Sequence, residues 1–321
     1  MSETKKASGT PNKNNVGTKK ALNFCGKRKI FLIISLSLIA ITILATFILK
    51  INVAIEFKGG TIITYKYSET INENEIKSVV EEIVNTPVKI NAGENIGTGE
   101  KNITISFTSE EGLSAEKQSE ITDTIQEKFP ESELSLLDST DVSPSSGREF
   151  FLKCIVAVIL SAIVLIIYIA FRFKKIGGLS AGVCAVIALC QDLILVYGSF
   201  IICGFEINSN FMAVILTILG YSINDTIVIY DRIRENKQIM PKTKLAELVN
   251  LSCTQSLTRS IRTSITTVAT MLIVTIVIAL NGYTSLLSFT VPLIFGMTLG
   301  AYSSLCVAPM LWVWWNERKN K

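Results

Sequence analysis

The sequence predicts a polytopic α-helical membrane protein with six transmembrane helices and a small α+β domain between the first two of them. Three observations support this fold class. Hydrophobic residues make up 49% of the 321 residues and charged residues only 18%. Several apolar runs approach or exceed the roughly 20 residues that cross a bilayer. Residues 51–148 lack such a run, are acidic, and have the periodicities of alternating strands and helices.

Residues 1–26 are expected to form a disordered cytoplasmic tail, because they are polar, lysine-rich and poor in large apolar side chains. An apolar run at 30–49 follows the basic triplet from Lys27 to Lys29. The run is too long for the apolar core of a signal peptide and has no suitably placed small-residue cleavage site. It is predicted to be a retained first transmembrane helix.

Residues 51–148 are predicted to form a ferredoxin-like domain. The segment GGTIITYKYS alternates like a strand, and the following helix places apolar residues on one face, as does a second helix that Ser114 caps. TPVKIN, NITISFT and ELSLLDST supply the other strands. The resulting β-α-β-β-α-β order is that of the split βαβ, or ferredoxin-like, unit. Its carboxylates are scattered, so we expect binding or mechanical work from this domain, not chemistry.

Residues 150–315 are predicted to hold transmembrane helices 2–6, followed by a short cytoplasmic tail at 316–321. The expected spans are 150–171, 179–203, 211–230, 264–280 and 286–315, the last bent by Pro292 and Pro309. Basic residues precede the first span, join the second to the third and the fourth to the fifth, and end the chain. By the positive-inside rule both termini are cytoplasmic and the acidic domain is extracytoplasmic. Trp312, Trp314 and Trp315 are then expected at the cytoplasmic interface.

The composition also excludes some kinds of site. Histidine is absent, so the chain alone cannot form an imidazole proton relay, a histidine metal site or a Ser-His-Asp triad. The seven cysteines occur singly, mostly in apolar runs, and are interpreted as small core residues. The segregation of charge argues against nucleic acid as a partner and favours a fixed orientation in the membrane lipid. We expect no cofactor.

Two carboxylates, Asp192 and Asp225, lie within the predicted spans. An ionised group at the bilayer centre costs about 2.5 to 3.5 kcal/mol on insertion scales, so each should face the protein interior. Asp225 follows Thr217 and Tyr221 at steps of four, with Ser222 three residues before it, and these residues predict a polar stripe on one helix face. Asn224 points about a quarter turn away.

Arg259 is the best cationic candidate to face Asp225. An arginine nearby favours the ionised carboxylate and desolvation favours the protonated form, so separating the two groups would make the carboxylate take up a proton. The alternative is a static ion pair or interhelical hydrogen bond. Asp192 lies among small residues and is either a buried acceptor for a neighbouring helix or part of an ion path.

Four segments, GYSINDTIVIYDRIREN, QSLTRSIRTSITT, AIEFKGGT and VSPSSGREF, together resemble the SecF family of membrane proteins that assist the Sec protein-export machinery. The longest is GYSINDTIVIYDRIREN, which includes Gly220, Tyr221, Ser222, Asp231 and Arg232, and QSLTRSIRTSITT is similar to the family's next motif. AIEFKGGT, with Gly59, Gly60 and Thr61, and VSPSSGREF resemble the segments that flank the family's extracytoplasmic domain. The resemblance extends from the first span to the C-terminus.

The resemblance implies a partner and a mechanism. SecF-like proteins pair with SecD, a homologous half, in a twelve-span assembly related to resistance-nodulation-division transporters. That assembly uses the proton or sodium gradient to help draw preproteins out of the SecYEG channel after SecA has pushed them through. In such proteins the residues matching Asp225 and Arg259 are implicated in ion coupling. Asn224 and Asp192 are further candidate ion-coupling residues in this chain.

This chain departs from the family pattern at two positions. It has Glu56 where the family usually has aspartate, a mild change, and Gln191 where the family usually has a histidine before Asp192. The second departure removes a titratable neighbour and weakens Asp192 as a proton-relay candidate.

Two other functions are alternatives to protein export. An intramembrane aspartyl protease would need Gly-x-Gly-Asp and Tyr-Asp patterns at its membrane aspartates, and neither Asp192 nor Asp225 lies in such a pattern. A half-size efflux transporter of the related superfamily would share the polar helix but usually has larger periplasmic domains. Copurification with SecD and SecYEG would favour export, and drug-dependent transport would favour efflux.

Overall fold

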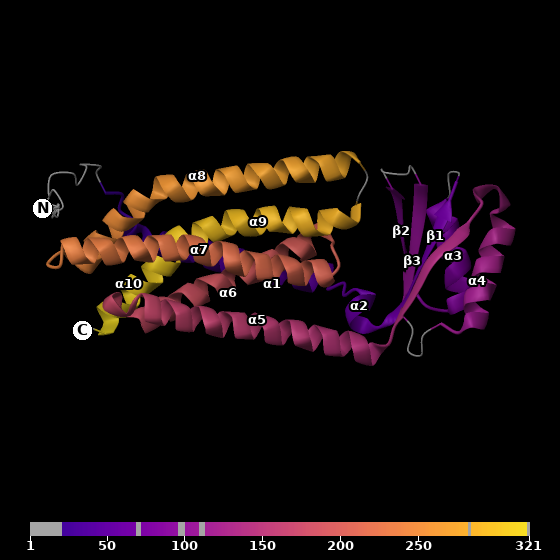
Figure 1. The fold of residues 1–321 in the computed structure, drawn as a ribbon, viewed down its shortest axis with the longest axis horizontal. Coiled ribbons are helices and arrows are strands. Elements are labelled where there is room, and N and C mark those ends of the chain that lie inside the picture. Colours follow the sequence, from indigo (N-terminus) through magenta and orange to yellow (C-terminus); the bar gives the residue numbers. More distant parts are fainter. Residues whose placement is uncertain (1–20, 69–71, 96–99, 109–112, 282–283, 320–321) are drawn as a thin grey trace, which may run out of the picture.

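A long helical bundle with a small sheet domain at one end makes up the molecule (Figure 1). The computed structural model describes residues 21–68, 72–95, 100–108, 113–281 and 284–319. In these ranges six helical segments are long and apolar enough to cross a membrane, as predicted from the sequence. They are Cys25–Leu49, Pro144–Arg172, Gly178–Cys203, Ser209–Ile239, Leu245–Leu280 and Leu286–Lys319.

Helices α6 (Gly178–Cys203), α7 (Ser209–Ile239) and α9 (Thr284–Cys306) form the centre of the bundle. They pack on one another and bury most of the apolar core. Helices α1 (Arg28–Leu49), α5 (Pro144–Arg172) and α8 (Leu245–Leu280) lie outside this centre and expose most of their apolar side chains. Such exposure is expected of helices that face lipid or further membrane helices.

Two helices differ from the sequence prediction. Helix α8 begins at Leu245, well before the predicted start at 264, because its first half is amphipathic and has no long apolar run. The last predicted span is divided into α9 and α10 (Ala308–Lys319), with Val307 in a turn between them. Pro309 lies in the first turn of α10, where its missing N–H removes no helical hydrogen bond.

Both described ends of the chain lie at the end of the bundle that is far from the sheet (Figure 1). Arg28, at the start of α1, forms an ion pair of 2.7 Å with Glu317 near the end of α10. The expected disordered tail reached residue 26, but Phe24 and Cys25 are buried, and the Cys25 N–H donates to Asn250 Oδ1 at 2.8 Å. Ordered packing therefore begins before the predicted boundary, and residues 1–20 lie outside the described part of the chain.

The sheet domain lies between α1 and α5 in the chain and has the predicted β-α-β-β-α-β order. Its strands are β1 (Gly60–Tyr67), β2 (Val88–Asn95), β3 (Glu100–Phe107) and β4 (Ser135–Val142). The sheet order is β2-β3-β1-β4 and all neighbouring strands are antiparallel. Helices α3 (Glu73–Val84) and α4 (Ala115–Lys128) cover one face and share a core with it. Burial there raises the pKa of the Tyr65 phenol, whose hydroxyl lies 3.0 Å from Thr122 Oγ1.

A short helix, α2 (Ile55–Lys58), joins the bundle to the sheet domain. Gly59 ends this helix with φ of 86°, and a Cβ there would lie 2.6 Å from backbone atoms of Pro144 at the start of α5. Gly60 also has positive φ, and the buried Thr61 donates a hydrogen bond to Asp141 in β4. The Gly-Gly-Thr motif thus lets the strand entering the domain pass close to the helix leaving it.

The same junction holds the start of α7. The Glu56 carboxylate accepts a hydrogen bond of 2.8 Å from the Ser209 N–H, and the Asn208 side chain accepts one from the Phe211 N–H. Two backbone hydrogen bonds also join residues 52 and 54 to Ile207. The first residues of α7 are therefore tied to the segment that enters the sheet domain.

Candidate functional site

The polar residues of α7 face three directions. Ser222 and Thr226 point to α6 and α9, whereas Tyr221 and Asp225 point to α8. Thr217, although predicted to share the stripe of Asp225, is exposed on the outside of the helix. The predicted single stripe is wrong, because residues three apart on a helix differ by about 60° and can face different neighbours.

Asp192 is fully buried where α6, α7 and α9 meet. Its Oδ2 accepts two hydrogen bonds of 2.7 Å, from Ser222 Oγ on α7 and Ser303 Oγ on α9. Its Oδ1 is buried without a hydrogen-bond partner among the described residues. The predicted role as a buried acceptor for neighbouring helices is confirmed.

Hydroxyl groups extend this cluster along α7 and α9. Ser304 Oγ donates to the Ser222 carbonyl at 3.0 Å, and Thr226 Oγ1 donates to Ser304 Oγ at the same distance. The close approach depends on Gly300, where a Cβ would lie 3.2 Å from the Ser222 Cβ. Gly296, one turn earlier, makes a still closer contact with Ile218. Both glycines therefore make the predicted small-residue contact.

Asp225 is 5% exposed and faces α8. Its Oδ2 is buried and has no hydrogen-bond partner in the described ranges. Arg259 of α8 interacts with it electrostatically, yet the pair does not reach the 4.0 Å of an ion pair. The structure thus brings the two predicted residues to the same site but leaves the carboxylate without a direct partner in the described part of the chain.

Four serines of α8 form a buried stripe against α7 that sequence analysis missed. They are Ser252, Ser256, Ser260 and Ser264. Ser264 Oγ receives a hydrogen bond from the Tyr221 hydroxyl at 3.4 Å, and Ser252 Oγ receives one from Asn236 Nδ2 at 2.8 Å. Their regular spacing of four, which keeps them on one helix face, was the available signal.

Ser260 lies at the level of Asp225. The antiparallel register set by the Tyr221–Ser264 and Asn236–Ser252 hydrogen bonds places these two residues at about the same height along the two helices. Ser260 is 1% exposed, and its Oγ, like Asp225 Oδ2, has no hydrogen-bond partner within the described chain. The interface between α7 and α8 therefore contains two buried polar atoms without hydrogen-bond partners at the same height. The Tyr221–Ser264 and Asn236–Ser252 hydrogen bonds lie on either side of them.

The remaining motif residues of α7 lie toward its C-terminal end. Asp231 contacts Arg172 of α5 at 3.0 Å and Arg234 at 2.8 Å. Arg232 forms the predicted pair with Glu235, at 2.8 Å, and also donates to Gln255 of α8 at 2.7 Å. These contacts anchor the end of α7 to two neighbouring helices.

Gly220 and Asn224 lie on the outer face of α7 with Thr217. A Cβ at Gly220 would meet nothing within 4 Å. Asn224, a candidate ion-coupling residue, is exposed and does not share the face of Asp225. A face of small and polar residues on a membrane helix is suited to close contact with another helix.

The chain matches a family model and curated proteins over most of its length. Residues 121–318 match the family described as protein export membrane protein SecD/SecF, C-terminal. Protein translocase subunit SecF of Petrotoga mobilis is 32% identical over 304 residues, which cover 94% of this chain and 98% of that protein. SecF of Alicyclobacillus acidocaldarius is 34% identical, with coverages of 84% and 85%.

Fused proteins and solved structures also match. Protein translocase subunit SecDF of Bacillus subtilis is 32% identical over 93% of this chain, which spans 39% of the fusion. The crystal structure of SecDF, a translocon-associated membrane protein from Thermus thermophilus, superposes with a TM-score of 0.75 at 30% identity, covering 94% of this chain and 39% of that one. SecDF in a super-membrane-facing form gives a TM-score of 0.67 at 29% identity, with coverages of 94% and 40%.

Proposed function

Because this chain belongs to the SecD/SecF family of protein export membrane proteins, we propose that it is a SecF-type subunit that uses an ion gradient to promote protein export. The observation that carries this proposal is Asp225, a nearly buried carboxylate that faces Arg259 without an ion pair. A carboxylate inside a membrane bundle is rare and commonly marks an ion pathway.

The coupling ion is a proton or Na⁺. Burial disfavours the bare carboxylate, and either ion would neutralise it; approach of the Arg259 guanidinium would stabilise the ionised form instead. Loading and release of the ion would therefore change the force between α7 and α8. The unpaired Ser260 hydroxyl at the same level supplies an oxygen that would solvate the ion or a water molecule.

The start of α7 would transmit this change to the sheet domain, which we assign as an extracytoplasmic ferredoxin-like domain. The hydrogen bond from Ser209 N–H to Glu56 joins α7 to the segment that leads into β1. Basic residues gather at the opposite end of the bundle, where α5 meets α6 and α7 meets α8, which supports cytoplasmic termini.

A SecD-type protein is the proposed membrane partner. The fused SecDF relatives support this assignment, since this chain matches about two fifths of their length. The outer face of α7 with Gly220 and Asn224 is the proposed contact, because it is small, polar and exposed on the bundle surface. The translocon SecYEG, the motor SecA and the moving preprotein would be partners of that assembly.

The test is export by membrane vesicles that contain this chain with its SecD-type partner. Asp225→Asn should abolish gradient-stimulated release of preprotein, because the amide cannot be ionised, while membrane insertion and partner binding persist. Imposing a pH gradient or a sodium gradient separately identifies the ion. Undiminished gradient stimulation in this variant would rule out the coupling role.

A further inference from the structure

A basic pocket lies where the apolar span of α5 ends. It has a volume of about 490 Å³ and is lined by Phe171, Arg172, Lys174, Lys175, Arg234 and Gln238. The lining comes from the C-terminal end of α5, the following turn and the last part of α7. The volume is more than ten times the ~30 Å³ that a water molecule occupies in the liquid, so the pocket has room for a polar headgroup.

Two of its cations are held in place. Asp231 contacts Arg172 at 3.0 Å and Arg234 at 2.8 Å, and both guanidinium groups lie within 6 Å of the buried Phe173 ring, at 5.5 and 5.9 Å. Asp231 offsets one of the four positive charges, so the lining keeps an excess of three. Fixed guanidinium groups bind phosphate well because little side-chain freedom is lost on binding.

The pocket also has a lipid-facing wall. Phe171 is 79% exposed, and Ile167 and Tyr168 before it expose about half of their side chains. These residues belong to the apolar stretch of α5, which ends at Arg172. An acyl chain packed along α5 would therefore place its headgroup at the basic lining.

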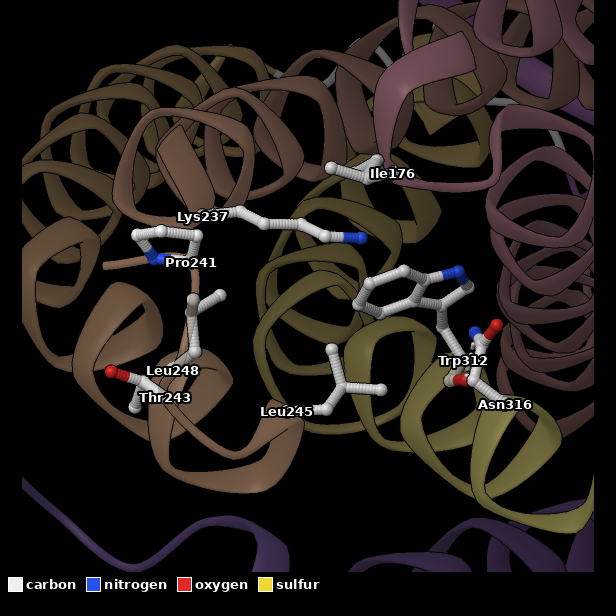
Figure 2. A pocket seen from close by; sticks show the side chains of 8 residues that line it. All are labelled: Ile176, Lys237, Pro241, Thr243, Leu245, Leu248, Trp312 and Asn316. Atoms are coloured by element: carbon white, nitrogen blue, oxygen red, sulfur yellow. Dashed lines mark hydrogen bonds between the residues drawn. The ribbon is translucent and has the colours of Figure 1, made fainter. Parts of the chain in front are cut away.

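A second pocket at the same end of the bundle has a different character. It measures about 190 Å³ and lies between the α7–α8 connection and α10. Figure 2 shows its one cationic lining residue, Lys237, extending over an apolar floor toward Trp312. A pocket at this end of the bundle therefore does not have several positive charges merely because basic residues are common there.

We propose that the pocket lined by Arg172, Lys174, Lys175 and Arg234 binds the phosphate group of an anionic phospholipid, whose acyl chain lies against Phe171. Two features select this occupant: the excess positive charge, and the position at the boundary between an apolar span and a basic loop. A bound lipid would fix the end of α7 relative to α5.

The test is native mass spectrometry of the purified full chain, with phosphatidylglycerol and phosphatidylcholine as probes. The informative variant is Lys174→Gln with Lys175→Gln, because both side chains are exposed and neither has a hydrogen bond or ion pair in the described part of the structure. Lys242→Gln with Lys244→Gln is the matched control, since it removes two exposed charges at the same end of the bundle, outside the pocket. Phosphatidylglycerol affinity should fall roughly tenfold to thirtyfold in the first variant only.

Three outcomes would overturn the proposal. Equal losses in the two variants would mean diffuse attraction, and no loss in either would mean that the pocket is not a lipid site. Phe171→Ser separates a lipid from a free phosphate: it should weaken phosphatidylglycerol binding without changing the binding of glycerol 1-phosphate. If glycerol 1-phosphate binds the unaltered chain as tightly as the lipid does, the pocket is a site for soluble phosphate.

Discussion

Two aspartates that look alike in the sequence have different surroundings in the structure. Each has one buried oxygen without a hydrogen-bond partner among the described residues, but Asp192 accepts hydrogen bonds from two helices through its other oxygen. Asp225 faces an arginine beyond ion-pair distance instead. Two interhelical hydrogen bonds tie the Asp192 carboxylate to the packing, whereas that of Asp225 is more readily available to bind an ion. We therefore rank Asp225 above Asp192 as the coupling residue.

Asp192→Ala should lower the stability of the bundle by about 1 to 3 kcal/mol, because the variant loses two interhelical hydrogen bonds. Asp192→Asn keeps an oxygen that can accept from both serines and should lose less. The measurement is the thermal unfolding midpoint in detergent. Equal losses in the two variants would show that the charge, and not the hydrogen bonds, matters there.

Gly59→Ala should be far more damaging than Gly204→Ala. Both glycines have positive φ. Gly204 is in the left-handed region, which costs an alanine about 1 to 2 kcal/mol, whereas Gly59, with φ 86° and ψ 153°, has a conformation that is essentially restricted to glycine. A Cβ at Gly59 would also collide with the Pro144 backbone, whereas one at Gly204 would meet nothing within 4 Å. Expression level and thermal stability of the two variants measure the difference, and similar values would argue against a tight junction.

Residue patterns predicted which side chains are polar and buried, but not which helix each one meets. Ser222 and Asp225 are three residues apart, and that small angular difference sends one toward α9 and the other toward α8. Only the packing of the helices decides such a division. The serine stripe of α8 was predictable from its spacing, because each serine follows the last by four.

At the scale of elements, the length of the apolar runs in the sequence predicted the membrane spans well. It predicted poorly where amphipathic extensions of these helices begin. The six spans follow from hydropathy, and the strand and helix order of the sheet domain follows from its periodicities. The first half of α8 was missed because serines make up much of its buried face. Ser252, for example, accepts a hydrogen bond from Asn236 of α7 and donates one to the Leu248 carbonyl of its own helix. Hydropathy counts such residues as polar whether or not they are buried.

Two serine substitutions at the interface between α7 and α8 separate an effect on stability from an effect on ion coupling. Ser252→Ala removes a hydrogen bond to Asn236 and should destabilise the bundle by about 0.6 to 1.7 kcal/mol. Ser260→Ala removes an unpaired hydroxyl, so stability should change by less than about 0.5 kcal/mol. Gradient-stimulated export should nevertheless fall in Ser260→Ala, and normal export there would exclude the hydroxyl from the ion site.

At the scale of the whole molecule, a surface ion pair joins the sheet domain to the bundle in addition to the contacts around α2. Lys89 of β2 forms an ion pair of 2.9 Å with Glu206 in the connection between α6 and α7. Both side chains are partly exposed, so the pair is worth at most about 1 kcal/mol. An attachment this weak can break and re-form as the domain moves.

Lys89→Glu should shift the domain away from the bundle, with up to about a fivefold change in the population of the attached arrangement. Distances between spin labels on the sheet domain and on the α7–α8 connection, measured in the full chain, report that population. Adding Glu206→Lys should restore the original distances. Failure of this reversal would mean that the pair does not control the position of the domain.

Under the proposed function, the hydrogen bond between Glu56 and the first residue of α7 would make that helix a lever. Asp225 lies about 24 Å along the helix from Ser209 at 1.5 Å per residue, so a tilt of about 5° pivoting near the carboxylate would carry the tip sideways by about 2 Å. The displaced end of α7 is hydrogen-bonded to Glu56 of α2, which leads into β1 of the sheet. The outer edge of the sheet would therefore move through a wider arc. A small tilt of α7 near Asp225 would thus become a larger movement of the sheet domain.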